Sequence, residues 1–99
     1  MKAPNRYRVP EEVAGLLRRL HPVLKQKVRS GLELLAREPH AGKALREDLA
    51  GLYSLRTGRL RIVYRVGARR IVEIVAIGPR QTVYEDTLRI LRRESRGRG

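Results

Sequence analysis

Two amphipathic helical patterns fill the first third of the chain. Apolar residues recur at helical spacing over 13–20, after Pro10 and two acidic residues that suit a first helical turn. Pro22 interrupts this pattern, and a second one with a basic opposite face covers 24–35. A short β-favouring segment at 7–9 precedes both. We therefore expect a strand followed by a helical hairpin.

The second half of the chain changes to the period of two that is typical of strands. Residues 52–66 alternate about the sequence 57–60, in which Gly58 can adopt the positive φ of a II′ hairpin turn. Residues 71–77 are almost continuously apolar, which predicts a strand buried on both faces at the centre of a sheet. The preceding residues 43–50 show no clear pattern and predict a turn or an irregular connector.

A short helix and a basic tail are expected at the end of the chain. Thr82 and Glu85 have the spacing of a capping box, so the helix should begin at Thr82. Leu88 and Leu91 would then face inward. We expect the basic tail over 92–99 to be flexible.

The order of these elements predicts the fold class. The order β-α-α-β-β-β-α gives an α+β domain, in which the helical hairpin packs on one face of a small, mostly antiparallel sheet. Ninety-nine residues have room for one core, so residues 1–99 should form a single domain. The other face of the sheet would be open to solvent.

The predicted hairpin places like charges opposite each other. If Thr57 pairs with Leu60, Arg56 lies across from Arg61, and both share the open face with Arg65. Opposed like charges destabilise a strand pair, so folding alone does not explain them. We expect an anion-binding site on this face.

The composition supports a polyanionic partner. The formal net charge is +13, which favours binding to nucleic acid, an acidic protein or an anionic membrane surface. Every cation between residues 51 and 80 is arginine, which binds phosphate through two parallel hydrogen bonds. A solvated basic surface in an arginine-rich sequence is the alternative interpretation.

Several function classes are not expected. The absence of cysteine excludes disulfides and thiolate metal sites, and we expect no metal or cofactor. His21 and His40 fall in predicted loops, so we expect surface histidines. No apolar run approaches the roughly 20 residues of a membrane-spanning helix, and the start has no signal-peptide pattern. We expect a cytoplasmic protein.

A second group of candidate residues follows the apolar strand. Arg80 lies just beyond its end and could reach the same anion as the hairpin arginines, and Tyr84 lies about one helical turn later. A tyrosine can act as a general base where neighbouring positive charge favours its anion. The alternative for Tyr84 is a ring that packs on the sheet, four residues before Leu88.

The motifs together resemble the RelE/ParE superfamily of toxin–antitoxin toxins, over roughly residues 7–91. The resemblance rests on these segments: Leu45-Arg46, Leu49-Ala-Gly-Leu-Tyr53-Ser-Leu-Arg56, Gly58-Arg-Leu-Arg61-Ile-Val-Tyr64, Ile77-Gly-Pro-Arg80 and Val83-Tyr84. RelE-type toxins are ribosome-dependent endoribonucleases, in which the messenger's own 2′-hydroxyl attacks the adjacent phosphate. The resemblance therefore implies an mRNA interferase that needs no metal.

The resemblance also implies roles for single residues. Arg61 and Arg80 would stabilise charge at the scissile phosphate, and Arg56 would orient the phosphate or stabilise the leaving oxygen. Tyr84 would accept the proton of the 2′-hydroxyl. These four residues are the expected catalytic set.

Further positions are assigned to RNA binding: Arg46, Ser54, Arg59 and Arg65. Arg46 matches a family position that contacts RNA. Ser54 stands where the best-known RelE members have lysine, so one cation is missing, and Arg59 in the turn is a candidate replacement.

The implied partners are a cognate antitoxin, messenger RNA and the ribosome, with the toxin and antitoxin forming a hetero-oligomer. Two alternatives stay open. ParE-type toxins keep the fold but lack this catalytic set and inhibit DNA gyrase, and a non-catalytic RNA- or ribosome-binding module could use the same basic face. The combination of Arg61, Arg80 and Tyr84 favours the RelE branch.

Overall fold

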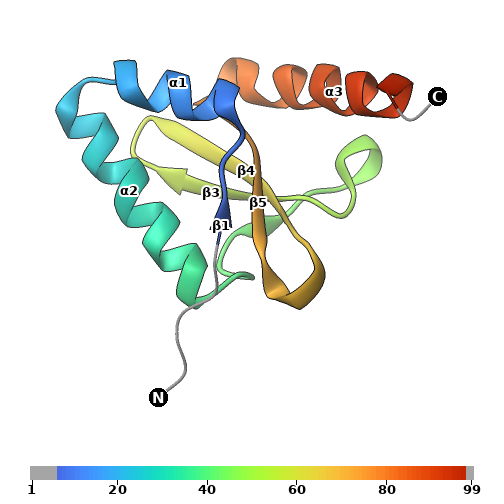
Figure 1. Ribbon diagram of the computed structural model, residues 1–99, viewed down its shortest axis with the longest axis horizontal. Helices are drawn as coiled ribbons and strands as arrows, with labels where there is room; N and C mark the ends of the chain where they lie inside the picture. Colours follow the sequence, from blue (N-terminus) through green and yellow to red (C-terminus); the bar gives the residue numbers. More distant parts are fainter. Residues whose placement is uncertain (1–6, 98–99) are drawn as a thin grey trace.

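The computed structural model describes residues 7–97, which form three helices and a five-stranded sheet (Figure 1). In chain order the elements are β1 (Tyr7–Arg8), α1 (Glu11–Arg19), α2 (Pro22–Arg37), β2 (Lys43–Ala44), the 3₁₀ turn η1 (Glu47–Leu49), β3 (Tyr53–Thr57), β4 (Leu60–Val66), the 3₁₀ turn η2 (Ala68–Arg70), β5 (Val72–Pro79) and α3 (Arg80–Gly97). The predicted α+β class and order of the main elements are confirmed. Within 7–97, no helix combines the length and apolarity needed to span a membrane.

The sheet has the order β1-β5-β4-β3-β2 and is mostly antiparallel, with β1 parallel to β5. The strand predicted at 71–77 is β5, and it is buried on both faces as expected. It is not the middle strand, which is β4. The reason is the extra strand β2, where Lys43 and Ala44 pair with Ser54 and Tyr53 in the segment predicted as a connector.

The helical hairpin of α1 and α2 covers one face of the sheet. His21 caps α2, because its Nδ1 accepts a hydrogen bond of 3.2 Å from the backbone N–H of Val23. The core on this side is aliphatic around a single tyrosine; it comprises Val13, Val28, Leu32, Leu35, Leu60, Ile62, Tyr64, Val72, Ile74 and Ile77. This side of the fold matches the prediction.

The opposite face of the sheet is not open, contrary to the prediction, because residues of α3 pack against it. In Figure 1, α3 runs across the top of the sheet. A second apolar cluster fills the space between them: Leu52, Val63, Val75, Ala76 and Val83. A bulge enlarges this cluster, because Val63 pairs with Ala76 while Tyr64 pairs with Ile74, so that Val75 is the extra residue on β5. Leaving these side chains in water would be unfavourable, which explains why α3 covers them.

Helix α3 differs from the prediction at both ends. It begins at Arg80, directly after β5, so Thr82 lies within the first turn instead of capping it. Burial decides this start, because it places Val83 and Thr87, both fully buried, against the sheet. The helix continues to Gly97, so residues 92–97 are helical and not a flexible tail. Residues 98–99 of the predicted tail lie outside the described part of the chain.

Candidate active site

The β3–β4 hairpin holds two arginines opposite each other, as predicted. Thr57 pairs with Leu60, and Arg56 pairs with Arg61. Gly58 has a φ of 73°, so the two-residue turn uses the left-handed conformation that glycine allows. Arg56 is exposed and Arg61 is half-buried. The hairpin therefore presents two guanidinium groups at one end of the sheet.

The end of β5 brings a third arginine to the same end. Arg61 pairs with Gly78 and Leu60 pairs with Pro79, and Arg80 follows immediately as the exposed first residue of α3. The N-terminus of a helix carries a partial positive charge, which adds to that of the arginines. We call Arg56, Arg61 and Arg80 the arginine rim. Three cations and a helix N-terminus in one place favour a phosphate.

Tyr84 lies one helical turn beyond Arg80 and reaches the hairpin. Its hydroxyl is 3.2 Å from Oγ of Ser54, which pairs with Val63 and shares a face of β3 with Arg56. Ser54 is only 6% exposed because α3 covers it. The structure therefore brings Tyr84 together with the arginine rim, and it gives Ser54 the role of a hydrogen-bond partner of Tyr84.

A fourth cation near the rim comes from α2. A Cβ atom built at Gly58 would lie 3.3 Å from Nζ of Lys27, so this lysine reaches the hairpin turn. Lys27 and Arg56 also line the same cavity, of about 410 Å³, between α2 and β3. The sequence signal for Lys27 was the basic face of the second helix, but the pattern alone could not show that this face reaches the turn.

The other predicted RNA-binding residues lie in different surroundings. Arg59 is exposed in the hairpin turn beside the rim. Arg46 is exposed and lies at the opposite end of β3, because its neighbour Leu45 donates a hydrogen bond to the carbonyl of Leu52. Leu52 is on the order of 14 Å along the strand from Arg56. The structure therefore separates Arg46 from the rim.

Arg65 is engaged in ion pairs. Its Nε lies 2.9 Å from a carboxylate oxygen of Glu73, and its two terminal nitrogens each lie 3.2 Å from Glu94 on α3. The hydrogen bonds to Glu94 raise the pKa of the Arg65 guanidinium above its ordinary value. We therefore assign Arg65 to holding α3 on the sheet.

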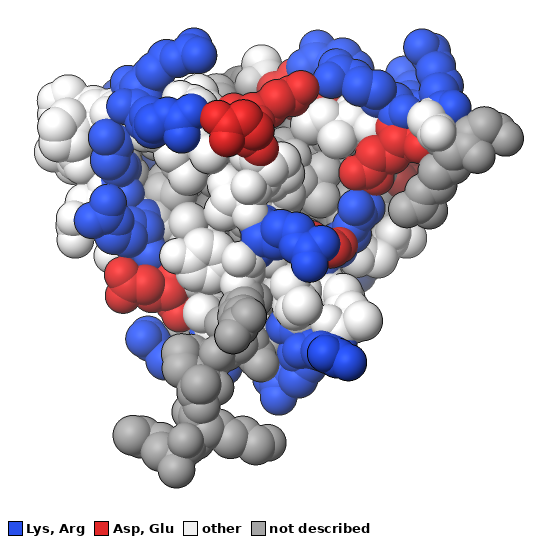
Figure 2. Space-filling model, in the orientation of Figure 1, with Lys and Arg blue, Asp and Glu red and all other residues white. Residues whose placement is uncertain are grey.

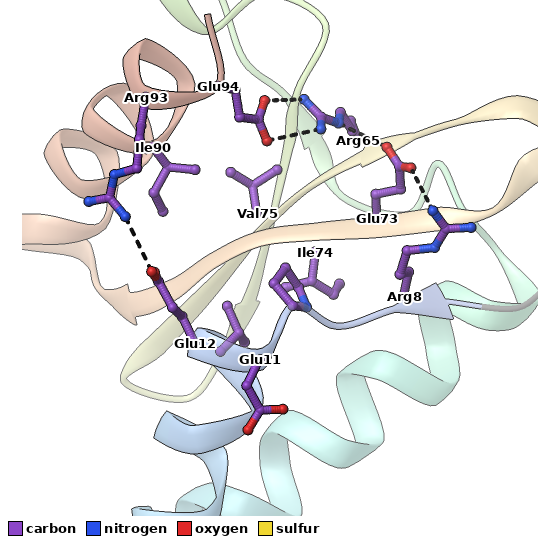
Figure 3. A pocket seen from close by; sticks show the side chains of 12 residues that line it. Arg8, Glu11, Glu12, Arg65, Glu73, Ile74, Val75, Ile90, Arg93 and Glu94 are labelled. Atoms are coloured by element: carbon purple, nitrogen blue, oxygen red, sulfur yellow. Dashed lines mark hydrogen bonds and ion pairs between the residues drawn. The ribbon is translucent and has the colours of Figure 1, made fainter. Parts of the chain in front are cut away.

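A cavity of about 600 Å³ lies apart from the rim, between α1, β5 and α3 (Figure 3). Its floor is apolar, with Ile74, Val75 and Ile90, and its border carries charged side chains that pair with one another. The pairs are Arg8–Glu73, Arg65–Glu73, Arg65–Glu94 and Arg93–Glu12. Neutralised charges around an apolar floor do not resemble a phosphate site, so the rim is the better candidate for chemistry.

Comparison with known proteins identifies relatives of this chain. A family model described as the ParE toxin of the type II toxin-antitoxin system parDE matches residues 14–84. The toxin-antitoxin complex RelBE2 from Mycobacterium tuberculosis contains a chain 32% identical in sequence, with a TM-score of 0.69; the match covers 79% of this chain and 100% of that chain.

Two more distant structures share the fold. A mutant of the E. coli toxin RelE in the free state is 20% identical, with a TM-score of 0.69, and the match covers 88% of this chain and 97% of that one. The archaeal RelE-RelB complex from Pyrococcus horikoshii is 22% identical, with a TM-score of 0.64 and coverage of 79% and 97%. No match was found among curated proteins.

Proposed function

Since the chain belongs to the RelE/ParE superfamily of type II toxin–antitoxin toxins, we propose that it is an endoribonuclease toxin that cleaves messenger RNA. One observation carries the proposal, namely that Arg56, Arg61, Arg80 and Tyr84 come from three elements to one end of the sheet. A toxin that acts only by binding another protein has no need of a tyrosine hydroxyl beside a phosphate-binding group of arginines.

The proposed reaction is an internal transesterification. Tyr84 accepts the proton of a ribose 2′-hydroxyl, and the 2′-oxygen forms a bond to the adjacent phosphorus. The bond from phosphorus to the 5′-oxygen breaks, which leaves a cyclic phosphate and a 5′-hydroxyl after protonation from water. Arg61 and Arg80 stabilise the added negative charge of the pentavalent phosphate, and Arg56 stabilises the leaving oxygen.

Two residues bear on the missing lysine, namely Ser54, which stands where RelE members have lysine, and Lys27, which comes close to the hairpin turn. Ser54 is buried and its side chain carries no charge, but its hydroxyl can donate a hydrogen bond to Tyr84. Lys27 approaches the hairpin turn from α2 and shares a cavity with Arg56. We propose that Lys27, together with Arg59, supplies the positive charge that RelE members obtain from lysine at the position of Ser54.

An antitoxin partner is part of the proposal. The solved relatives include complexes of a RelE toxin with RelB. A chain with a formal net charge of +13 requires a partner that neutralises it, so we expect an acidic or amphipathic segment. Figure 2 shows one face of the molecule, and the basic side chains on it lie mainly along its margins, over α2, α3 and the lower edge of the sheet.

Inhibition of DNA gyrase is the second candidate function, and the specific observation in its favour is the ParE family model. A non-catalytic RNA- or ribosome-binding module is the third.

One experiment separates these candidates. The chain is expressed under tight control, and translation, messenger integrity and DNA breaks are measured for the parent, Arg61→Ala, Arg80→Ala and Tyr84→Phe. The proposal predicts messenger cleavage by the parent and loss of cleavage in each variant. Intact messenger with accumulating DNA breaks would identify a gyrase inhibitor, and stalled translation without cleavage in all four proteins would identify a binding module.

A further inference from the structure

The end of the sheet opposite the arginine rim carries a second group of cations. Arg37, the last residue of α2, and Arg70, the last residue of η2, line one cavity of about 310 Å³ with Glu38, Pro39, His40 and Ala41. We call it the Arg37–Arg70 pocket. Because β4 runs from Leu60 at the rim to Val66 before η2, the pocket and the rim are on the order of 20 Å apart.

The backbone of η2 indicates that folding alone does not select its arginines. Arg69 and Arg70 have φ values of 58° and 62°, in the left-handed region that glycine and asparagine adopt more readily. Two consecutive residues with side chains in this region are strained, and glycine would relieve the strain. These positions nevertheless carry arginine. The β3–β4 hairpin is similar in this respect, because it carries opposed arginines although their charge repulsion disfavours strand pairing.

An aromatic side chain lies beside these cations in a fixed position. The ring of His40, which is exposed, packs edge-on against Tyr53 with 5.4 Å between centroids. Tyr53 in turn stacks on Tyr64 at 5.5 Å. Tyr64 is fully buried, and its hydroxyl accepts a 2.9 Å hydrogen bond from the backbone N–H of Gly42. His40 is therefore supported by the core while its ring reaches solvent.

We propose that the Arg37–Arg70 pocket is a second, non-catalytic contact site for single-stranded RNA. Arg37 and Arg70 contact phosphates, and His40 stacks on an unpaired base, which is how proteins commonly hold single strands. The exposed Glu38 at the border weakens the local positive charge, which suits a passing strand better than a tightly held phosphate. This inference rests on the proposed function, because it assumes that RNA is the substrate.

Binding of the purified chain to a short single-stranded RNA oligonucleotide, at several salt concentrations, tests the phosphate contacts. Arg37→Ala and Arg70→Ala should each weaken binding. Each should also make the negative slope of log affinity against log salt shallower by about 0.7. The matched control Arg19→Ala removes an exposed arginine on α1 and should change the slope less. Equal effects of all three substitutions would show that the pocket arginines act only through the net charge of the chain, and this would overturn the inference.

Two further variants separate recognition from folding and from simple charge. Arg70→Gly relieves the left-handed strain and should weaken RNA binding as much as Arg70→Ala does; normal binding by the glycine variant would overturn the role of Arg70. His40→Ala should weaken RNA binding about tenfold but leave binding to polyglutamate, which has no bases, unchanged. Equal losses for both probes would indicate a site for an acidic peptide instead.

The failure of this inference can be distinguished from the failure of the proposed function. If the parent cleaves RNA and the pocket variants bind RNA like the parent, only the pocket proposal is wrong. If the parent neither binds nor cleaves RNA, both proposals are wrong. If the inference holds, the pocket variants will need a higher RNA concentration than the parent for half-maximal cleavage, because they lose contacts that bind the substrate.

Discussion

At the scale of single residues, the hydroxyl of Tyr84 defines the candidate site. It reaches the hairpin through one hydrogen bond to Ser54, and this bond fixes where a general base would stand relative to the arginine rim. The sequence placed Tyr84 near the rim but could not show this bond, because residues 30 positions apart meet only once the sheet and α3 have packed. The same packing buries Ser54 and removes it from direct contact with RNA.

Replacing Ser54 tests this bond. Ser54→Ala should lower the free energy of unfolding by about 1 kcal/mol, and it should lower kcat for RNA cleavage with little change in KM, because the hydroxyl of Tyr84 loses its orientation. Urea unfolding and single-turnover cleavage measure both effects. The control Ser30→Ala, on the exposed surface of α2, should match the parent. A normal kcat in Ser54→Ala would contradict the assigned role.

Tyr64 gives a prediction of pH dependence. Burial raises the pKa of its hydroxyl above the ordinary value of about 10, and the hydrogen bond from Gly42 opposes this only in part. The unfolded chain therefore loses this proton at a lower pH than the folded chain does. The resulting stabilisation is fully present below about pH 10 and is lost as the pH rises through the folded-state pKa.

Urea unfolding across this pH range measures the effect. The free energy of unfolding should fall with pH above about 10, and it should fall less in Tyr64→Phe. Tyr7→Phe, which removes a more exposed hydroxyl, should behave like the parent. Identical slopes for the parent and Tyr64→Phe would show that Tyr64 does not cause the pH dependence.

At the scale of elements, α2 approaches the hairpin closely because Gly31 has no side chain. A Cβ at Gly31 would lie 2.6 Å from Cγ2 of Thr57 and 3.2 Å from Cδ1 of Ile62, which is too close. At Gly15 on α1, the nearest atom would be a flexible nitrogen of Arg18 at 3.8 Å. The two helices therefore differ sharply in how they tolerate the same methyl group.

This difference gives a matched pair of substitutions. Gly31→Ala should lower the free energy of unfolding by about 1–3 kcal/mol, because it forces α2 away from β3 and β4. Gly15→Ala should raise it by about 0.5–1 kcal/mol, because alanine is the better helix former. Urea unfolding of both variants measures these changes. An equal increase in the free energy of unfolding of both variants would mean that α2 does not pack as closely as described.

Helix α3 is held at its far end by ion pairs of Arg65 with Glu94 and of Arg93 with Glu12. These side chains are partly exposed, so solvent screens the pairs, and a double-mutant cycle on Arg65 and Glu94 should give a coupling of about 0.5–1 kcal/mol. Hydrogen exchange at the end of α3 should rise in Arg65→Ala. The more exposed pair Arg89–Asp86 serves as the control, and its loss should have a smaller effect. A coupling near zero for Arg65 and Glu94 would show that this pair does not help to hold α3 on the sheet.

At the scale of the whole molecule, local patterns predicted the order of the main elements and the register of the hairpin. They failed where tertiary packing decides. Strand β2 has two residues and forms only because β3 pairs with it. The long α3 covers the face that was predicted to be open, because Leu52 and Val63 lie on it as well as the arginines. The net charge predicts an anionic partner, but it could not show that Arg65 is neutralised within the fold.

The net charge and the two cationic ends give the molecule its proposed mode of action. In this proposal the arginine rim performs the chemistry, and the Arg37–Arg70 pocket holds the strand on the order of 20 Å away. The arginines that line the cavity of about 600 Å³ are paired with carboxylates, so they contribute little positive charge to RNA binding.

The most direct test of the central claim is the chemistry of the cut ends. The purified chain is incubated with translating ribosomes and a messenger, with Tyr84→Phe as the control, and the products are analysed by end-group mass spectrometry. The proposed reaction predicts a 2′,3′-cyclic phosphate and a 5′-hydroxyl with the parent, no cleavage with Tyr84→Phe, and no cleavage of a messenger that carries a 2′-deoxyribose at the cut site. Cleavage of the deoxy-substituted messenger, or an intact messenger with the parent, would contradict it.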